Sequence, residues 1–231
     1  MNIRTVLTFL LFITQAACEP QRTQEINFDK LGFNASKPKD EIEHQTESDT
    51  TFVVMQEYAE GFSYDMKYAT DDNFLKRKVY SCDKCMIRKE VANKLIAAND
   101  SLINLGFRIK FFDCYRPVDV QKLMWKIYPK PGYVANPYTS GSIHNRGGAV
   151  DITLVRLDGK EVEMGTAFDF FGKEANHDFT DLPENILKNR KLLKEVMESF
   201  SFKSIRTEWW HYNFINARQY ALSNFQTDCN Y

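Results

Sequence analysis

The chain has little that would attract a polyanion. Its 30 Lys and Arg residues are balanced by 31 Asp and Glu residues, the formal net charge is -1, and no dense basic tract occurs. Nucleic acid and an anionic membrane surface are therefore not expected as partners. Internal repeats are also absent, and 231 residues with 43% hydrophobic content suit one compact domain better than two.

The apolar stretch Val6–Ile13 is too short to span a bilayer, which takes about 20 residues. It follows the positive charge of Arg4 and precedes Ala16 and Ala17, a pattern typical of an export signal over residues 1–18. The mature protein is therefore expected outside the cytoplasm.

Small residues directly before Cys18 are also typical of a bacterial lipoprotein signal, in which Cys18 would carry the lipid. Gln15 departs from that pattern, which prefers an aliphatic residue at this position. Ordinary signal cleavage near Cys18 is the alternative. The expected location is accordingly periplasmic or lipid-anchored at the cell envelope, with the lipid as the only membrane contact.

Residues 19–50 are polar and charged, contain Pro20 and Pro38, and show no sustained helical or strand period. This composition predicts a flexible linker. A surface segment packed on the domain is the alternative. The folded domain is predicted over residues 51–231.

Within that domain, hydrophobic periodicity predicts helices over 89–105, after Pro117, and over 184–200, and strands over 62–68, 107–112, 149–155, 160–164 and 209–214. Asp158 and Gly159 are typical of a hairpin turn between the third and fourth of these strands. This order predicts an α+β fold with helices outside a small, mostly antiparallel sheet.

Two motifs supply the ligands of a metal. His144 and Asp151 lie in the run SIHNRGGAVDIT, and Glu208 and His211 lie in the run EWWH. A catalytic zinc keeps three protein ligands and leaves one position for water or substrate. We therefore expect one zinc ion on His144, Asp151 and His211, with Glu208 as the base. Because successive strand residues face opposite sides, Glu208 and His211 reach one metal only if a bulge or strand start lies near Glu208.

Such a set of residues predicts hydrolysis of an amide bond. Zinc lowers the pKa of its bound water toward about 7 and polarises a carbonyl group, while Glu208 would take the water proton and pass it to the leaving amine. Arg116, in the run DCYRP, is the best candidate to stabilise the developing oxyanion. A purely structural ion pair with Asp113 is the alternative role for this arginine.

The cysteines leave several options open. The pair Cys82-x-x-Cys85 is compatible with half of a structural zinc site, a redox pair or a disulfide, and no second Cys-x-x-Cys completes a metal site. In an exported protein, these two cysteines with Cys114 and Cys229 could form two disulfides. Three pairings are then available, and the sequence does not choose among them.

Taken together, the motif Ser-x-His-x-x-Gly-x-Ala-x-Asp at 142–151 and the motif Glu-x-Trp-His at 208–211 resemble the D-alanyl-D-alanine metallopeptidases. Segments at 64–70 with 73–74, 113–117 and 164–171 are similar to the D-alanyl-D-alanine dipeptidase branch, the vancomycin-resistance type. The resemblance covers about residues 52–215, which is nearly the whole predicted domain.

The resemblance implies that His144, Asp151 and His211 bind zinc, that Glu208 is the general base and that Arg116 stabilises the tetrahedral intermediate. It also implies that Ser142 and Asp169 hold the free amino terminus of a dipeptide. A buried carboxylate that faces an ammonium group would explain a preference for dipeptides, since a longer peptide would leave Asp169 unpaired. Without the resemblance, Asp169 is better interpreted as a helix or turn cap.

The implied activity is zinc-dependent hydrolysis of D-Ala-D-Ala to two D-alanines. The alternatives are a D,D-carboxypeptidase that cuts peptidoglycan stem peptides and a non-catalytic, zinc-stabilised module that binds wall peptides. The presence of Glu208 and Arg116 disfavours the second alternative. An exported enzyme cannot reach a cytosolic dipeptide pool, so export favours turnover or scavenging of wall fragments over resistance. The sequence gives no indication of the oligomeric state.

Overall fold

The protein is described by a computed structural model at residues 50–226 and 229. The predicted export signal, with Cys18, and the predicted linker up to residue 49 lie outside the described residues. Thr50 is described, and its carbonyl oxygen accepts a hydrogen bond from the Arg88 guanidinium. In the part of the chain that is described, no helix is long and apolar enough to cross a membrane.

Strands and helices are interspersed along the chain, and β6 and β7 follow each other directly. The strands are β1 (Phe52–Val54), β2 (Ser63–Tyr64), β3 (Met86–Arg88), β4 (Phe107–Asp113), β5 (Ala149–Arg156), β6 (Phe202–Ile205) and β7 (Glu208–Phe214). The α-helices are α1 (Met55–Tyr58), α2 (Lys89–Ile103), α3 (Val118–Ile127) and α4 (Glu184–Ser199). Short 3-10 helices are η3 (Lys67–Ala69), η4 (His144–Arg146), η5 (Lys173–Ala175) and η6 (Ala217–Gln219).

Five of these strands form the central sheet, in the order β2-β4-β5-β7-β6. Strand β2 runs parallel to β4, and the other three pairings are antiparallel. Strands β1 and β3 form a separate two-stranded antiparallel sheet. The predicted α+β fold with a small, mostly antiparallel sheet is therefore confirmed.

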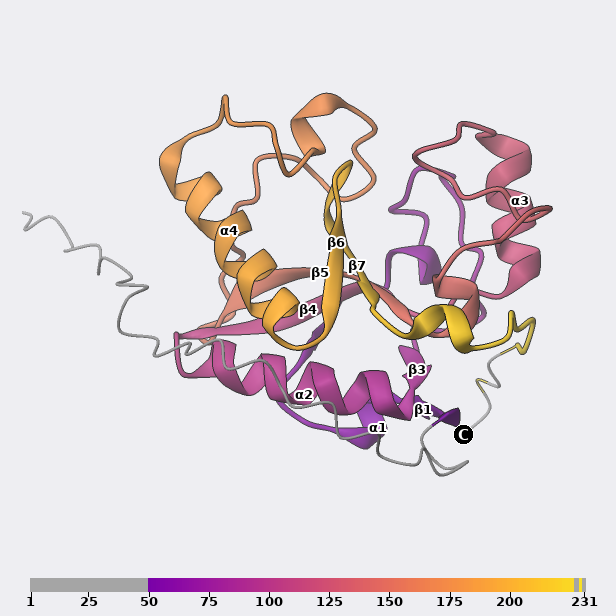
Figure 1. Ribbon diagram of the computed structural model, residues 1–231, viewed down its shortest axis with the longest axis horizontal. Coiled ribbons are helices and arrows are strands. Elements are labelled where there is room, and N and C mark those ends of the chain that lie inside the picture. The colour runs from indigo at the N-terminus through magenta and orange to yellow at the C-terminus, as the bar shows by residue number, and fades with distance from the viewer. Residues whose placement is uncertain (1–49, 227–228, 230–231) are drawn as a thin grey trace, which may run out of the picture. The chain divides into compact units, whose positions relative to one another are not determined.

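One face of the central sheet packs on α2 and α4, which also contact each other (Figure 1). Apolar residues at helical spacing in α2, namely Val91, Leu95, Ala98 and Leu102, are all fully buried. Opposite them, the cross-strand partners Ile109 and Leu154 of β4 and β5 are also buried. Because antiparallel partners share a face, the same register turns alternate residues of β5 toward the opposite side of the sheet.

A second, smaller core lies beside α3, which is set apart from α2 and α4 in Figure 1. It contains the buried residues Tyr68, Leu75, Val120, Met124 and Val134. The segment that follows β2 thus packs against α3, which brings its side chains near the Arg116 segment that precedes this helix.

The structure differs from the predicted elements in several places. The strand predicted over 62–68 ends after Tyr64 and gives way to η3, because the carbonyl of Lys67 accepts from the Asn73 side chain in a local turn. The turn at Gly159 is present, but the strand predicted over 160–164 is reduced to one bridge between Val155 and Glu161. Strands β1, β3 and β6 and helix α1 were not predicted.

Candidate metal centre and active site

Of the predicted metal-binding residues, Asp151 and His211 lie on the sheet face that is turned away from α2 and α4, and His144 lies in η4, shortly before β5. Asp151 of β5 pairs directly with His211 of β7, so both side chains leave the same face of the sheet. A register shift between Phe111 and Asp113 of β4 places Asp113 opposite Asp151 as well. Without this bulge, strict alternation would turn Asp113 toward the apolar core with Phe111.

A second irregularity places Glu208 beside His211. In the β6–β7 pair, Ser204 opposes Tyr212 but the next residue, Ile205, opposes Glu208. The intervening residues of β7 form a bulge, which breaks the alternation that would separate Glu208 from His211. The Oε2 atom of Glu208 lies 4.0 Å from Nδ1 of His211. The irregularity predicted near Glu208 is thus confirmed.

Three potential ligand atoms converge at this point. Atoms Nε2 of His144 and Nδ1 of His211 are 3.2 Å apart, and they lie 3.3 and 2.9 Å from Oδ1 of Asp151. Among the described residues, these three form the group able to hold a metal ion, with ligand atoms within 4.8 Å of one another. All three side chains are buried, so little water competes for the converging atoms.

Neighbouring groups fix the tautomer of each imidazole. Nδ1 of His144 lies 2.6 Å from the carbonyl oxygen of Cys114, and Nε2 of His211 lies 3.0 Å from Oδ1 of Asn213. Because both partners are acceptors, each of these nitrogens must carry the proton and donate. The two nitrogens that face each other are then both lone-pair acceptors. This arrangement is unfavourable for neutral rings alone but suits two ligands of one cation, so the residues fit zinc.

The carboxyl groups around this point differ in their ionisation. Burial would raise the pKa of Asp151, but His144 and His211 outweigh it and hold the pKa well below its usual range. Burial, with a smaller contribution from nearby acids, raises the pKa of Glu208 to about 8 and that of Asp169 to about 8. A divalent cation between the histidines would lower both values, since it favours the charged form of each carboxyl.

Arg116 approaches the same point from the segment between β4 and α3. Its Nε and Nη2 atoms donate to Oδ2 of Asp113, at 3.0 and 2.6 Å, and Nη1 donates to Oε1 of Gln121 at 2.9 Å. A guanidinium has five N–H groups, so two remain available to a ligand. The predicted Asp113 ion pair is therefore present, and it holds Arg116 with Nη2 at 3.7 Å from Asp151.

Asp169 and Ser142 come from different loops but line the same cavity. The hydroxyl of Tyr68 donates to the Asp169 carboxylate at 3.0 Å, and Asp169 has a left-handed φ of 59°. Non-glycine residues held at positive φ are uncommon and cluster at functional sites. Ser142 Oγ accepts from the backbone N–H of His144 at 3.2 Å, which ties this serine to a metal-binding residue.

The cavity over the metal-binding residues has a volume of about 310 Å³. All seven of the predicted site residues line it: Arg116, Ser142, His144, Asp151, Asp169, Glu208 and His211. Carboxylates, imidazoles and guanidinium groups thus surround one space large enough for a small peptide.

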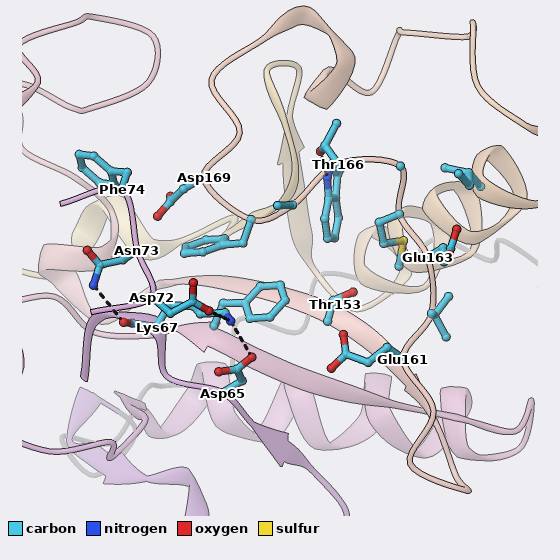
Figure 2. A pocket seen from close by; sticks show the side chains of 18 of the residues that line it. Asp65, Lys67, Asp72, Asn73, Phe74, Thr153, Glu161, Glu163, Thr166 and Asp169 are labelled. Carbon is cyan, nitrogen blue, oxygen red and sulfur yellow. Dashed lines mark hydrogen bonds and ion pairs between the residues drawn. The ribbon is translucent and has the colours of Figure 1, made fainter. Parts of the chain in front are cut away.

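A larger cavity of about 720 Å³ is also lined by Asp169 and contains none of His144, Asp151 and His211. In Figure 2, Lys67 lies between the carboxylates of Asp65 and Asp72, which it contacts at 2.9 and 2.6 Å. Asp169 is the one site residue that borders both cavities. The larger cavity is therefore an adjoining space rather than the catalytic centre.

Comparison with known proteins agrees with this geometry. The family Peptidase_M15, described as D-ala-D-ala dipeptidase, matches residues 48–228. The chain belongs to this family. Membership makes it a zinc-dependent peptidase, consistent with the metal-binding group formed by His144, Asp151 and His211.

Individual relatives carry the same name. The D-alanyl-D-alanine dipeptidase of Escherichia coli K12 is 33% identical over 79% of this chain and 94% of its own length. That of Enterococcus faecalis V583 is 35% identical over 71% of this chain and 92% of its own length. The solved structure of vancomycin-resistance D,D-dipeptidase VanXYg with a D-Ala-D-Ala phosphinate analog matches 58% of this chain and 52% of its own, with 20% identity and a TM-score of 0.38.

Two disulfides resolve the pairing that the sequence left open. Cys85 pairs with Cys114, and Cys82 pairs with Cys229. The Cys82-x-x-Cys85 motif is therefore neither half of a zinc site nor an internal redox pair. Cys114 is also the residue whose carbonyl accepts the His144 hydrogen bond, so the first disulfide is directly linked to the segment that contacts His144.

Sequence reasoning did not identify several residues of this site. Tyr68, Gln121 and Asn213 each bond to a predicted site residue, and Arg218 lines its cavity. A signal existed only for Tyr68, which lies in the 64–70 segment that resembles the family. The other three depend on contacts between distant segments or on the β7 register, and no local pattern marks them.

Proposed function

We propose that this protein hydrolyses the dipeptide D-Ala-D-Ala to two D-alanines, with one zinc ion held by His144, Asp151 and His211. The observation that carries the proposal is the convergence of two tautomer-fixed imidazoles and one carboxylate beside Glu208 and Arg116 in a cavity of about 310 Å³. The shared name of the relatives supports the choice of substrate.

The residues around the ion have separate tasks in this mechanism. Zinc would supply Lewis acidity to the scissile carbonyl and acidify the attacking water. Glu208 takes the proton of that water and transfers it to the amine of the departing D-alanine. The two uncommitted N–H groups of Arg116 donate to the carbonyl oxygen as negative charge develops on it. Asp113 and Gln121 hold this guanidinium, so it needs no rearrangement during the reaction.

The amino terminus of the dipeptide is assigned to Asp169. Its carboxylate lines the cavity and accepts from the Tyr68 hydroxyl, which leaves further lone pairs for an ammonium group. Ser142, which lines the same cavity, supplies a hydroxyl group. An ammonium group that approaches Asp169 would favour its ionised form, which burial by itself disfavours.

A D,D-carboxypeptidase acting on longer stem peptides is the second candidate. The observation in its favour is the 720 Å³ cavity, because it begins at Asp169 and could accommodate residues that precede the terminal dipeptide. The two candidates differ in what Asp169 must do. In a dipeptidase it pairs with an ammonium, whereas a stem peptide would present an uncharged amide there.

The test is release of D-alanine by zinc-loaded protein without residues 1–18. The substrates are D-Ala-D-Ala, L-Ala-L-Ala and a pentapeptide that ends in D-Ala-D-Ala. The proposal expects cleavage of D-Ala-D-Ala alone, and a loss of at least about 100-fold in kcat for Glu208→Gln with zinc binding retained. Cleavage of the pentapeptide would instead indicate that the protein is a D,D-carboxypeptidase. No cleavage of any peptide would favour the non-catalytic binding module.

We further propose that the protein acts outside the cytoplasm on wall fragments, in turnover or scavenging. Two disulfides in the described residues support an oxidising compartment, since disulfides are rare in the cytosol. The lipid on Cys18 belongs to this proposal. Cell fractionation of the native protein, with a mass measurement of its N-terminus, tests both parts. An uncleaved N-terminus in the cytosolic fraction would refute them.

A further inference from the structure

Arg218 is a second guanidinium group in the wall of the active-site cavity. It belongs to η6, which follows β7, and it lines the cavity with His211 and Asn213. Its side chain is exposed, and the hydrogen bonds and ion pairs among the described residues include none to its guanidinium. Arg116, in contrast, already uses three of its N–H groups on Asp113 and Gln121.

The backbone that carries Arg218 is fixed relative to the metal-binding loop. Gly148 packs against Ala217 so closely that a Cβ on Gly148 would lie 2.2 Å from Cβ of Ala217. On the other side of Arg218, the Tyr220 hydroxyl donates to Glu90 at 2.5 Å, and the Tyr220 carbonyl accepts from Arg146 of η4. These contacts hold η6 beside the turn that follows His144, so the backbone of Arg218 is fixed in position next to this turn.

The charges of the cavity are complementary to a zwitterion. Its carboxylates are Asp151, Asp169 and Glu208, of which Asp151 belongs to the metal-binding group and Glu208 lies beside it. A free dipeptide carries an ammonium at one end and a carboxylate at the other. The mechanism above assigns the ammonium to Asp169 but leaves the carboxylate without a partner.

We propose that Arg218 binds the terminal carboxylate of the dipeptide, an inference that rests on the proposed dipeptidase function. A guanidinium suits this task because its N–H groups can pair with both oxygens of a carboxylate. Recognition of both ends then sets the length of the substrate. A peptide extended at its carboxyl end would present a neutral amide to Arg218.

The experiment compares D-Ala-D-Ala with D-alanyl-D-alanine amide, which lacks the terminal negative charge. We would measure the KM of the dipeptide and the inhibition constant of the amide against it, so that the amide need not be hydrolysed. For Arg218→Ala, the KM should rise about 10- to 100-fold, as expected for loss of a charge-assisted bond, while the inhibition constant of the amide changes little. Arg218→Lys should recover part of the dipeptide affinity.

The matched control is Arg206→Ala, which removes another exposed arginine that pairs with Asp178 and does not line the cavity. It should leave both constants unchanged. Equal weakening of dipeptide and amide by Arg218→Ala, or no weakening of either, would overturn the role of Arg218. Absence of D-Ala-D-Ala cleavage by the unmodified protein would instead refute the proposed function itself.

Discussion

The carbonyl oxygen of Cys114 lies 2.6 Å from Nδ1 of His144, so a residue of the buried disulfide also orients an imidazole of the proposed metal site. The backbone N–H of Cys114 donates to Oδ1 of Asp113 at 2.9 Å, and the other oxygen of that carboxylate holds Arg116. Metal binding and the orientation of the arginine therefore depend on one short segment. The Cys85–Cys114 disulfide attaches this segment to the residue directly before β3.

Replacing both cysteines of this disulfide, Cys85→Ala with Cys114→Ala, should lower the free energy of unfolding by about 2–4 kcal/mol. It should also weaken zinc binding, because the carbonyl that fixes the His144 tautomer gains freedom. Urea unfolding and competition with a zinc-chelating dye measure the two effects.

The control for this variant is Cys82→Ser with Cys229→Ser. Its disulfide joins the segment before β3 to the C-terminal segment, whereas the carbonyl that bonds to His144 belongs to Cys114 of the other disulfide. We expect reduced stability with unchanged zinc affinity. If the two double variants bind zinc equally well, the positioning role of the Cys85–Cys114 disulfide is wrong.

Asn213→Ala should weaken zinc binding about 10- to 100-fold, the usual effect of losing a partner that orients a metal-binding histidine. The side-chain oxygen of Asn213 accepts from Nε2 of His211 and so keeps the lone pair on Nδ1. Dye competition measures the affinity, and circular dichroism checks the fold. Asn216→Ala, at an exposed turn, is the control. Equal zinc affinity in the two variants would contradict the prediction.

His177 should make the protein less stable as the pH falls below about 6.5. Burial, assisted by the positive charges of Lys194 and Arg190, lowers the pKa of His177 from 6.5 to about 4. Between these values the unfolded chain binds a proton that the folded chain does not, so acidification favours unfolding. The loss amounts to at most about 3 kcal/mol between pH 7 and pH 4.

Urea unfolding of the unmodified protein and of His177→Gln, each at pH 7 and pH 5, tests this prediction. Other groups titrate over the same interval, so the difference between the two proteins is the relevant quantity. Stability should decline less on acidification in the variant. An identical decline in both would show that the His177 pKa is not depressed.

Gly148→Ala should destabilise the protein by about 1–3 kcal/mol and raise the KM for the dipeptide. The added methyl group would overlap Ala217, which precedes Arg218, and a well-packed site has no room for it. The backbone that carries Arg218 would therefore move. Gly159→Ala is the control, because no atom lies within 4 Å of its added Cβ and only the positive φ of 87° is penalised. A KM raised equally in both variants would contradict the link to Arg218.

The sequence by itself predicted the elements whose patterns are local. Helix α2 buries the residues that helical spacing selects, and strand β5 follows the apolar run after Gly148. The types of ligand could also be predicted, because two histidines and acidic residues in such motifs have few structural uses. All of the predicted site residues line one cavity.

Tertiary structure alone decided how these parts meet. The pairing of Cys85 with Cys114 spans 29 residues, and that of Cys82 with Cys229 spans 147, so neither leaves a local signal. The bulges that turn Asp113 and Glu208 toward His144 and His211 depend on the register of neighbouring strands. Arg218 reaches the cavity only because η6 packs on Gly148. The spacing of hydrophobic residues indicates which face of a helix or strand is buried. The position of that face relative to distant segments depends on packing between elements.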